Sequence, residues 1–136
     1  MSIAKTADLH ERVGDTKRRL KLTNELIERF EVQYAPLGIL ELWDQLNGRS
    51  HKPQARHVRD IVALALVGGG MSDLSADELM HKQGPEQNLH LLSVAQLVVG
   101  VTFFPEARLA AGEKKADGSD SVDPKSDQPT TAPATE

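Results

Sequence analysis

The sequence predicts a mainly α-helical protein, in which a short N-terminal β-hairpin is followed by a bundle of four to five helices and a disordered C-terminal tail. Two observations predict the helices and the hairpin: apolar residues recur at helical spacing over most of residues 24–104, and strand-like alternation occurs only before them. The third observation is a sharp change of composition near Gly112. With 136 residues, the chain has room for one ordinary domain. We expect a flexible N-terminus at residues 1–8, a helical domain at 9–111 and the tail at 112–136.

The predicted tail is acidic and rich in Pro, Ser and Thr. Between Gly112 and Glu136 its only sizeable apolar side chain is Val122. Such a segment buries too little apolar area to offset the conformational entropy lost on folding, so we expect it to be disordered. It carries six acidic residues and three lysines, whereas the whole chain has a net charge of −4. The helical domain is therefore nearly neutral.

Residues 9–22 form the predicted hairpin. Gly14-Asp15 supplies the turn. In the second strand Leu20 and Leu22 alternate with Arg19 and Lys21, which predicts one apolar and one basic face.

Two helices are expected next. Thr23 or Asn24 is placed to cap the first, Pro36 is suited to begin the second, and Asn47-Gly48 ends it. Their apolar stripes are Leu26, Ile27, Phe30 and Tyr34 in the first helix, and Ile39, Leu40, Trp43 and Leu46 in the second.

Three further helices complete the domain. Pro53 begins the third, which ends at Gly68-Gly69-Gly70, an expected turn that lets two helices pack closely. Ser75 and Glu78 have the spacing of a capping box for a short fourth helix. Pro85 begins the last helix and Pro105 ends it. The core-facing residues are expected to be Val58, Ile61, Val62 and Ala65 in the third helix, and Leu89, Leu92, Leu97, Val98, Val101 and Phe104 in the last.

The residues that carry chemistry in other proteins form no catalytic or metal-binding pattern here. There is no Cys, and none of the five His lies three or four residues from another, so we interpret them as surface or loop residues. The glycine run is followed by Met71-Ser72-Asp73, not by the Gly-Lys-Ser/Thr of a phosphate-binding loop. We therefore expect a protein that is not an enzyme and has no cofactor and no metal.

Membrane and nucleic-acid partners are also not expected. The most apolar stretch, Leu89 to Phe104, falls short of the ~20 residues that span a bilayer, which favours a buried core helix. A pI of about 5.7 argues against general nucleic-acid binding. The basic run of Lys17, Arg18, Arg19 and Lys21 lies on the predicted strand, where a solvated face explains it.

The order of several segments resembles a known family. A basic strand segment from Lys17 to Thr23 leads into Glu28-Arg29-Phe30-Glu31, and a later segment runs from Asp60 to Gly70. Leu74 to Met80 then precedes a Leu/Val-rich helix. This pattern resembles the small tail proteins of gene transfer agents and siphophage-type prophages, described as tail assembly chaperones or tail tube proteins. It covers about residues 10–110. The family usually has an aromatic residue where Arg18 and Arg19 stand, and the loop at 49–56 is longer here.

The resemblance implies a non-catalytic tail assembly chaperone that works in the cytoplasm of a bacterial host. Such a protein binds the tape measure protein before tail tube subunits assemble around it. It needs an exposed apolar surface and a tendency to self-associate. The second and last helices have more apolar residues than one packed face can use, and they supply the candidate partner-binding residues: Ile39, Trp43, Leu46, Leu91, Val94, Val98, Val101 and Phe103.

Two other functions stay open at this stage. One is a structural tail tube component, against which the helical spacing counts because tube walls are built from sheets. The other is a small helical DNA-binding regulator with a helix-turn-helix around residues 53–82. That segment has no basic recognition helix, since Leu79, Met80, His81 and Lys82 match one poorly.

Overall fold

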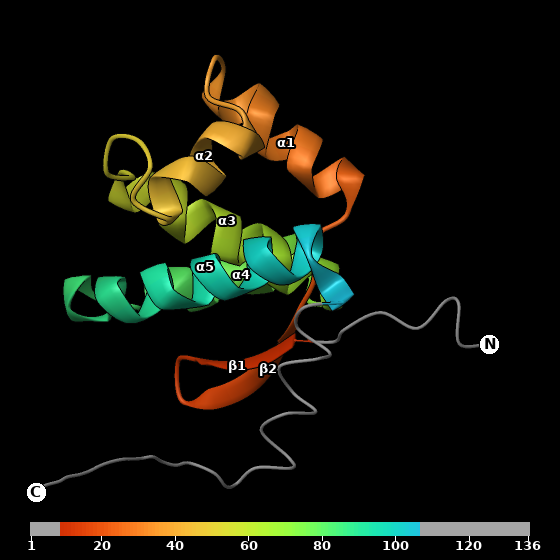
Figure 1. Ribbon diagram of the computed structural model, residues 1–136. Coiled ribbons are helices and arrows are strands. Elements are labelled where there is room, and N and C mark those ends of the chain that lie inside the picture. The colour runs from red at the N-terminus through yellow and green to blue at the C-terminus, as the bar shows by residue number, and fades with distance from the viewer. Residues whose placement is uncertain (1–8, 107–136) are drawn as a thin grey trace, which may run out of the picture.

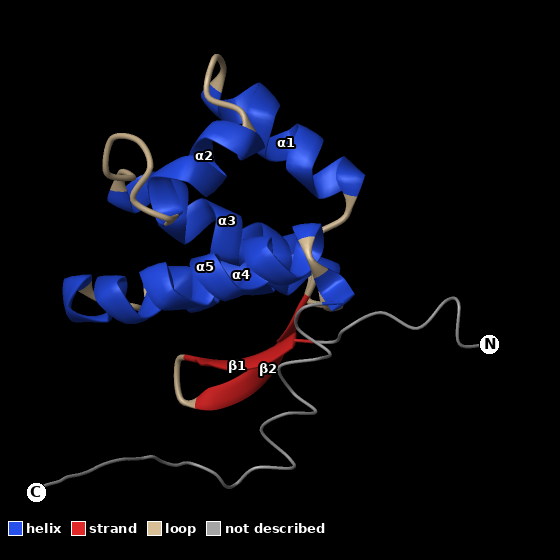
Figure 2. Ribbon diagram, in the orientation of Figure 1, coloured by secondary structure: helices blue, strands red, loops and turns tan. Residues whose placement is uncertain are grey.

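Two strands and five α-helices make up residues 9–106, the part of the chain that this computed structural model describes. The elements are β1 (Leu9–Val13), β2 (Thr16–Leu20), α1 (Asn24–Tyr34), α2 (Ile39–Leu46), α3 (Ala55–Gly68), α4 (Asp73–His81), the 3-10 turn η2 (Pro85–Gln87) and α5 (Asn88–Phe103). The predicted mainly α fold with an N-terminal hairpin is confirmed (Figure 2). The predicted flexible N-terminus and the tail at 112–136 lie outside the described residues.

Helix α3 is the centre of the domain. It packs against α5, α4, α1 and strand β2, so most of the core forms around it. Helices α1 and α2 lie on one side of the α5 layer, and the hairpin lies on the other side (Figure 1). One hydrophobic cluster runs from the hairpin through all five helices.

The hairpin forms as predicted, with Gly14 in the turn at φ 78°. Leu9 pairs with Leu20 and both are buried, as is Val13, so one face of the sheet joins the core. Arg18 lies on this inner face and is half-buried, and its Nε is buried. The basic run is therefore divided between the two faces of the strand. The exposed face consists of His10, Arg12, Lys17 and Arg19.

Helix starts depend on hydrogen bonds that the sequence predicts only in part. The Thr23 hydroxyl accepts from the Leu26 N–H at 3.3 Å, as expected for α1. Helix α2 begins at Ile39, three residues after Pro36, because the Glu31 carboxylate from α1 accepts from the Ile39 N–H at 2.9 Å. Ser72, not Ser75, caps α4 by accepting from the Ser75 N–H at 3.1 Å.

The buried faces of α2 and α5 also differ from the prediction. In α2 the buried residues are Ile39, Leu42 and Leu46, whereas Leu40 is 67% exposed. In α5 the expected core residue Leu89 is 81% exposed. The residues that α5 buries are Leu91, Val94, Ala95, Val98, Val99 and Val101. Apolar residues occur almost all round α5, so its spacing does not select a face, and the contacts with α3, α2 and β1 decide it.

The glycine run connects α3 to α4, as expected of an interhelical turn, but its tightest contact is with the backbone at and just after the end of β2. A Cβ atom on Gly68 would lie 1.8 Å from the Lys21 carbonyl oxygen. One on Gly69 would lie 1.9 Å from the Arg19 carbonyl oxygen. Because the Lys21 N–H also donates to the Ala65 carbonyl at 3.0 Å, the end of α3 and the end of β2 meet backbone to backbone.

Arg59 joins three elements. Its guanidinium donates to the carbonyls of Met80 at 2.6 Å and Gln83 at 2.9 Å, and to the Asn88 side chain at 2.9 Å. The structure places this cation at the C-terminal end of α4. Helix carbonyls that lack an intrahelical partner attract positive charge there.

Candidate functional site

Most of the predicted partner-binding residues lie in the core. Burial removes them from any surface that a partner would meet in this folded state, and only Trp43 and Phe103 are half-exposed. The six core residues, each 9% exposed or less, are Ile39, Leu46, Leu91, Val94, Val98 and Val101.

Three aromatic side chains form a partly exposed cluster where α2 meets the end of α5. The Trp43 ring lies 6.1 Å from the ring of Phe103 in an edge-to-face arrangement, and 6.1 Å from the tilted ring of Phe104. Gly100 faces the indole, and a Cβ atom on it would lie 3.4 Å from the ring, at ordinary van der Waals distance. Phe104 is 54% exposed. We call Trp43, Phe103 and Phe104 the aromatic patch.

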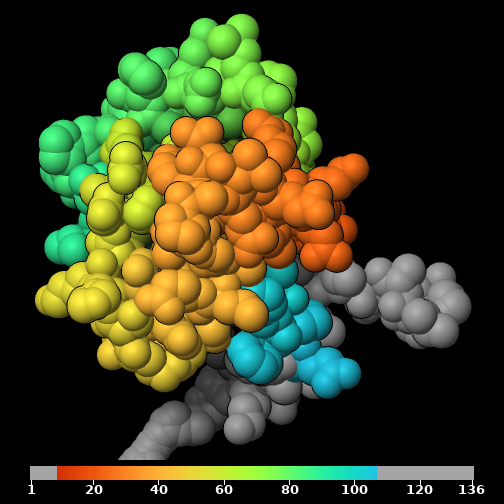
Figure 3. All heavy atoms as spheres, turned by 90° about the horizontal axis from the view of Figure 1, so that it is seen from above, coloured from red at the N-terminus to blue at the C-terminus, as the bar shows by residue number. Residues whose placement is uncertain are grey.

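A further apolar side chain, Leu40 of α2, lies beside the aromatic patch. Leu40 lies one turn before Trp43 on α2, a spacing that puts two side chains on the same face of a helix. The blue-green end of α5 lies beside the orange and gold residues of the α1–α2 region (Figure 3). Sequence reasoning expected both Leu40 and Phe104 to face the core. Their exposure follows from the way in which α2 crosses α5.

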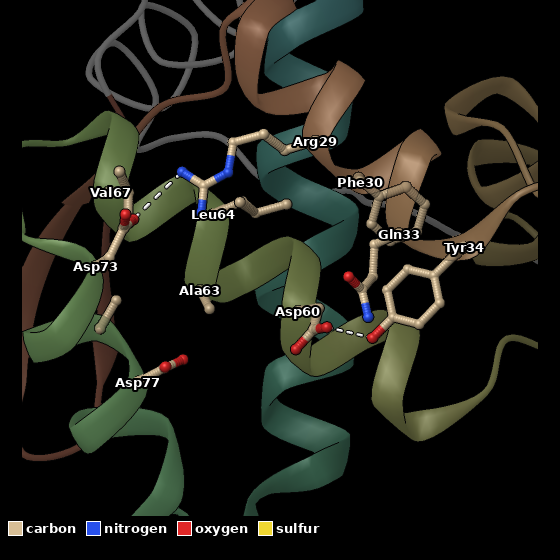
Figure 4. A pocket seen from close by; sticks show the side chains of 11 residues that line it. Arg29, Phe30, Gln33, Tyr34, Asp60, Ala63, Leu64, Val67, Asp73 and Asp77 are labelled. Atoms are coloured by element: carbon tan, nitrogen blue, oxygen red, sulfur yellow. Dashed lines mark hydrogen bonds and ion pairs between the residues drawn. The ribbon is translucent and has the colours of Figure 1, made fainter.

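A second hollow lies over α3, between α1 and α4, and we call it the α3 groove. It has a volume of about 200 Å³. Its floor is the α3 face with Asp60, Ala63, Leu64 and Val67 (Figure 4). The walls are Arg29, Phe30, Gln33 and Tyr34 from α1, and Asp73, Ala76 and Asp77 from α4. No spacing within one helix predicts this site, because three helices build it.

Two polar contacts lie along the α3 groove. Arg29 and Asp73 form an ion pair at 3.2 Å that connects α1 to α4, and both side chains are more than half exposed. At the other end the Tyr34 hydroxyl donates to the Asp60 carboxylate. Burial, followed by this hydrogen bond to Asp60, raises the pKa of the Tyr34 phenol to about 12. Tyr34 therefore remains protonated, and remains a donor to Asp60, at neutral pH.

His57 lies behind this pair and differs from the surface histidine that we expected. It is 7% exposed, and its ring lies 4.5 Å from the Tyr34 ring in an edge-to-face contact. Its Nδ1 is buried with no hydrogen-bond partner in the described part of the chain. Burial, with a smaller effect of the nearby Arg56 cation, lowers the pKa of His57. The fold therefore holds the neutral imidazole.

This burial predicts that acid destabilises the protein. The unfolded chain binds the His57 proton more tightly than the folded one, so stability is full above the ordinary pKa of 6.5 and falls as pH drops below it. The loss is at most about 1.4 kcal/mol per pH unit. Urea unfolding of the wild type and His57→Leu between pH 7.5 and 5 measures the difference. Equal slopes for the two proteins would contradict this assignment.

The described residues contain no group of three or more His, Cys, Asp or Glu side chains placed to hold a metal ion. Among residues 9–106, no helix has the length and apolar character needed to cross a bilayer. Comparison with protein-family models, curated proteins and solved structures finds no match for this chain. The fold and its surfaces define a small helical domain with an N-terminal hairpin, a partly exposed aromatic patch and a groove.

Proposed function

We propose that the protein is a non-catalytic phage or prophage tail morphogenesis protein. Specifically, we propose a tail assembly chaperone that binds the tape measure protein in the cytoplasm of the bacterial host and hands it to the tail tube subunits. The aromatic patch is the observation that carries this proposal, since it offers Trp43 and Phe104 to a partner. The resemblance in the sequence supplies the identity of that partner.

The chemistry of the aromatic patch suits an apolar helix of a tape measure protein. Aromatic rings bury large areas with few rotatable bonds, and Trp is prominent among the residues that dominate binding energy. Leu40 and Phe104 are more than half exposed and come from different helices. A partner helix laid across α2 and α5 would therefore cover both and leave the core of the chaperone unchanged.

Co-expression with a long helical tail protein encoded beside this one tests the proposal. Affinity capture followed by size exclusion should give a soluble complex with several copies of this chain per partner. Leu40→Asp combined with Phe104→Asp should reduce capture at least about tenfold, because two charges would be buried in an apolar contact.

Leu89→Asp is the matched control. Leu89 is also an exposed leucine, but it lies at the opposite end of α5 from Phe104, so its replacement should leave capture unchanged. If both variants bind as the wild type does, the aromatic patch is not the contact surface. Circular dichroism of each variant confirms that the fold is retained.

The two alternatives predict different results. A tail tube component would be found in purified particles and would show no capture of the tape measure protein. A DNA-binding regulator would shift DNA in a gel with strong salt dependence. Helix α4 would be the recognition helix of such a regulator, and it presents Asp73, Asp77 and Glu78, which would repel phosphates.

A further inference from the structure

The floor of the α3 groove is the one face of α3 that is left partly open. Asp60, Ala63, Leu64 and Val67 follow the spacing of a single helical face and are all half-buried. On the covered side of the same helix, Ile61, Val62 and Ala65 are fully buried. The open face spans about 10 Å along the axis, or two helical turns. This length matches a short helical segment laid between α1 and α4.

The walls of the α3 groove carry a surplus of negative charge. Asp60, Asp73 and Asp77 contribute three carboxylates against the single guanidinium of Arg29. Arg29 is engaged by Asp73, and one Asp60 oxygen accepts from Tyr34. Within residues 9–106 the Asp77 side chain has no ion-pair or hydrogen-bond partner, and it lies at the edge of the groove (Figure 4).

We propose that the α3 groove binds an arginine or lysine side chain presented by a helical segment of a partner protein. The floor of Ala63, Leu64 and Val67 fits the aliphatic stem of such a side chain, and the carboxylates of Asp73 and Asp77 receive its charged end. A small apolar residue on the next turn of the partner helix would lie over the rest of the floor.

The size of the α3 groove favours a side chain over a small molecule. Its volume of about 200 Å³ is below the roughly 300–1,000 Å³ of pockets for drug-sized ligands. Its lining combines apolar carbon with acidic oxygen, which matches a long cationic side chain better than an anionic or wholly apolar one. This inference does not rest on the proposed function, because the α3 groove and the aromatic patch share no residue.

Synthetic peptides test the inference on the full-length protein. The probe is an alanine-rich helical peptide of about 16 residues with one central arginine, and the control peptide has citrulline, which is neutral and of the same shape. Titration monitored by ¹H–¹⁵N NMR should show shifts at Leu64, Val67 and Asp77 with the arginine peptide. Affinity should fall roughly three- to tenfold with citrulline, because the charge-assisted contacts are lost.

Two variants locate the contact. Asp77→Asn should weaken binding of the arginine peptide roughly threefold or more. Glu78→Gln makes the same change of charge at the next residue of α4, outside the α3 groove, and should have little effect. Equal effects of the two variants would mean general attraction by an acidic helix and would overturn the proposal.

Arg29→Gln gives the sharpest test, because the proposal predicts tighter binding. Removing this guanidinium frees Asp73 and raises the negative charge of the α3 groove, so the arginine peptide should bind roughly two- to fivefold more tightly. A groove that is only a packing defect held together by the Arg29–Asp73 pair would loosen and bind more weakly. That result, or the absence of peptide binding to the wild type, overturns the proposal without affecting the test of the aromatic patch.

Discussion

Replacing Gly69 by alanine is expected to destabilise the protein by about 3 kcal/mol or more. The new methyl group would lie 1.9 Å from the Arg19 carbonyl oxygen and 2.6 Å from its carbonyl carbon. Backbone atoms cannot turn aside as a flexible side chain can, so α3 and β2 must separate. Separation breaks the Lys21 to Ala65 hydrogen bond and exposes Leu20, which is buried here. Urea or thermal unfolding measures the loss, and Gly68→Ala should give a similar result.

Gly84→Ala is the control for the effect of removing a glycine. Its Cβ would approach only the carboxylate of Glu86, which is the free end of a flexible side chain. Gly84 has φ −75° and ψ 175°, a conformation that alanine adopts readily before proline. We expect the free energy of unfolding of Gly84→Ala to stay within about 0.5 kcal/mol of the wild-type value. Equal stability of the Gly69 and Gly84 variants would contradict the close backbone approach.

Arg59→Met is expected to lower the free energy of unfolding by about 2–4 kcal/mol. Methionine keeps most of the apolar stem but removes three hydrogen bonds, including those to the carbonyls of Met80, in the last turn of α4, and of Gln83, just after it. Those carbonyls are partly buried, so the loss includes their desolvation. Loss of the positive charge destabilises the protein further, because a cation near a helix C-terminus interacts favourably with the helix dipole. Arg59→Lys should rescue only part of the loss, because a single ammonium does not reproduce the fork geometry.

Arg56→Met is the comparison on the same helix. Arg56 is exposed, donates to Gln54 at 3.0 Å and lies over the Tyr34 ring at 5.6 Å. These contacts are worth about 1 kcal/mol or less at an exposed site. A loss at Arg56 as large as that at Arg59 would show that the bonds of Arg59 to α4 and α5 contribute little.

The sequence predicts the elements better than it predicts their packing. The turn at Gly14, the Thr23 cap and the buried stripe of α3 are local, since spacing and turn chemistry decide them. The buried face of α5 is not local, because a helix that is apolar all round takes its orientation from its neighbours. The cap of α2 depends on Glu31, eight residues away on another helix, and no capping pattern in the sequence includes it.

The candidate surfaces also depend on how the helices pack, which the sequence predicts only in part. An excess of apolar residues in two helices pointed to Trp43 and Phe103, which the structure leaves half-exposed. It could not separate them from Val94 or Val98, because burial depends on where the helices cross. The α3 groove needed three helices to be placed, so its acidic walls had no signature in the sequence. Asp73 and Asp77 are explained equally well by the charge preference of a first helical turn.

The register of the hairpin has a consequence for how the domain folds. On its outer face Arg12 stands directly opposite Lys17, so two cations face each other across the strands. Like charges in facing positions disfavour strand pairing, and an isolated two-stranded hairpin is marginal even without them. Residues 9–20 alone should therefore have no stable structure. They gain it only when Leu9, Val13 and Leu20 pack on the helices, so the stability of the hairpin depends on its contact with the glycine end of α3.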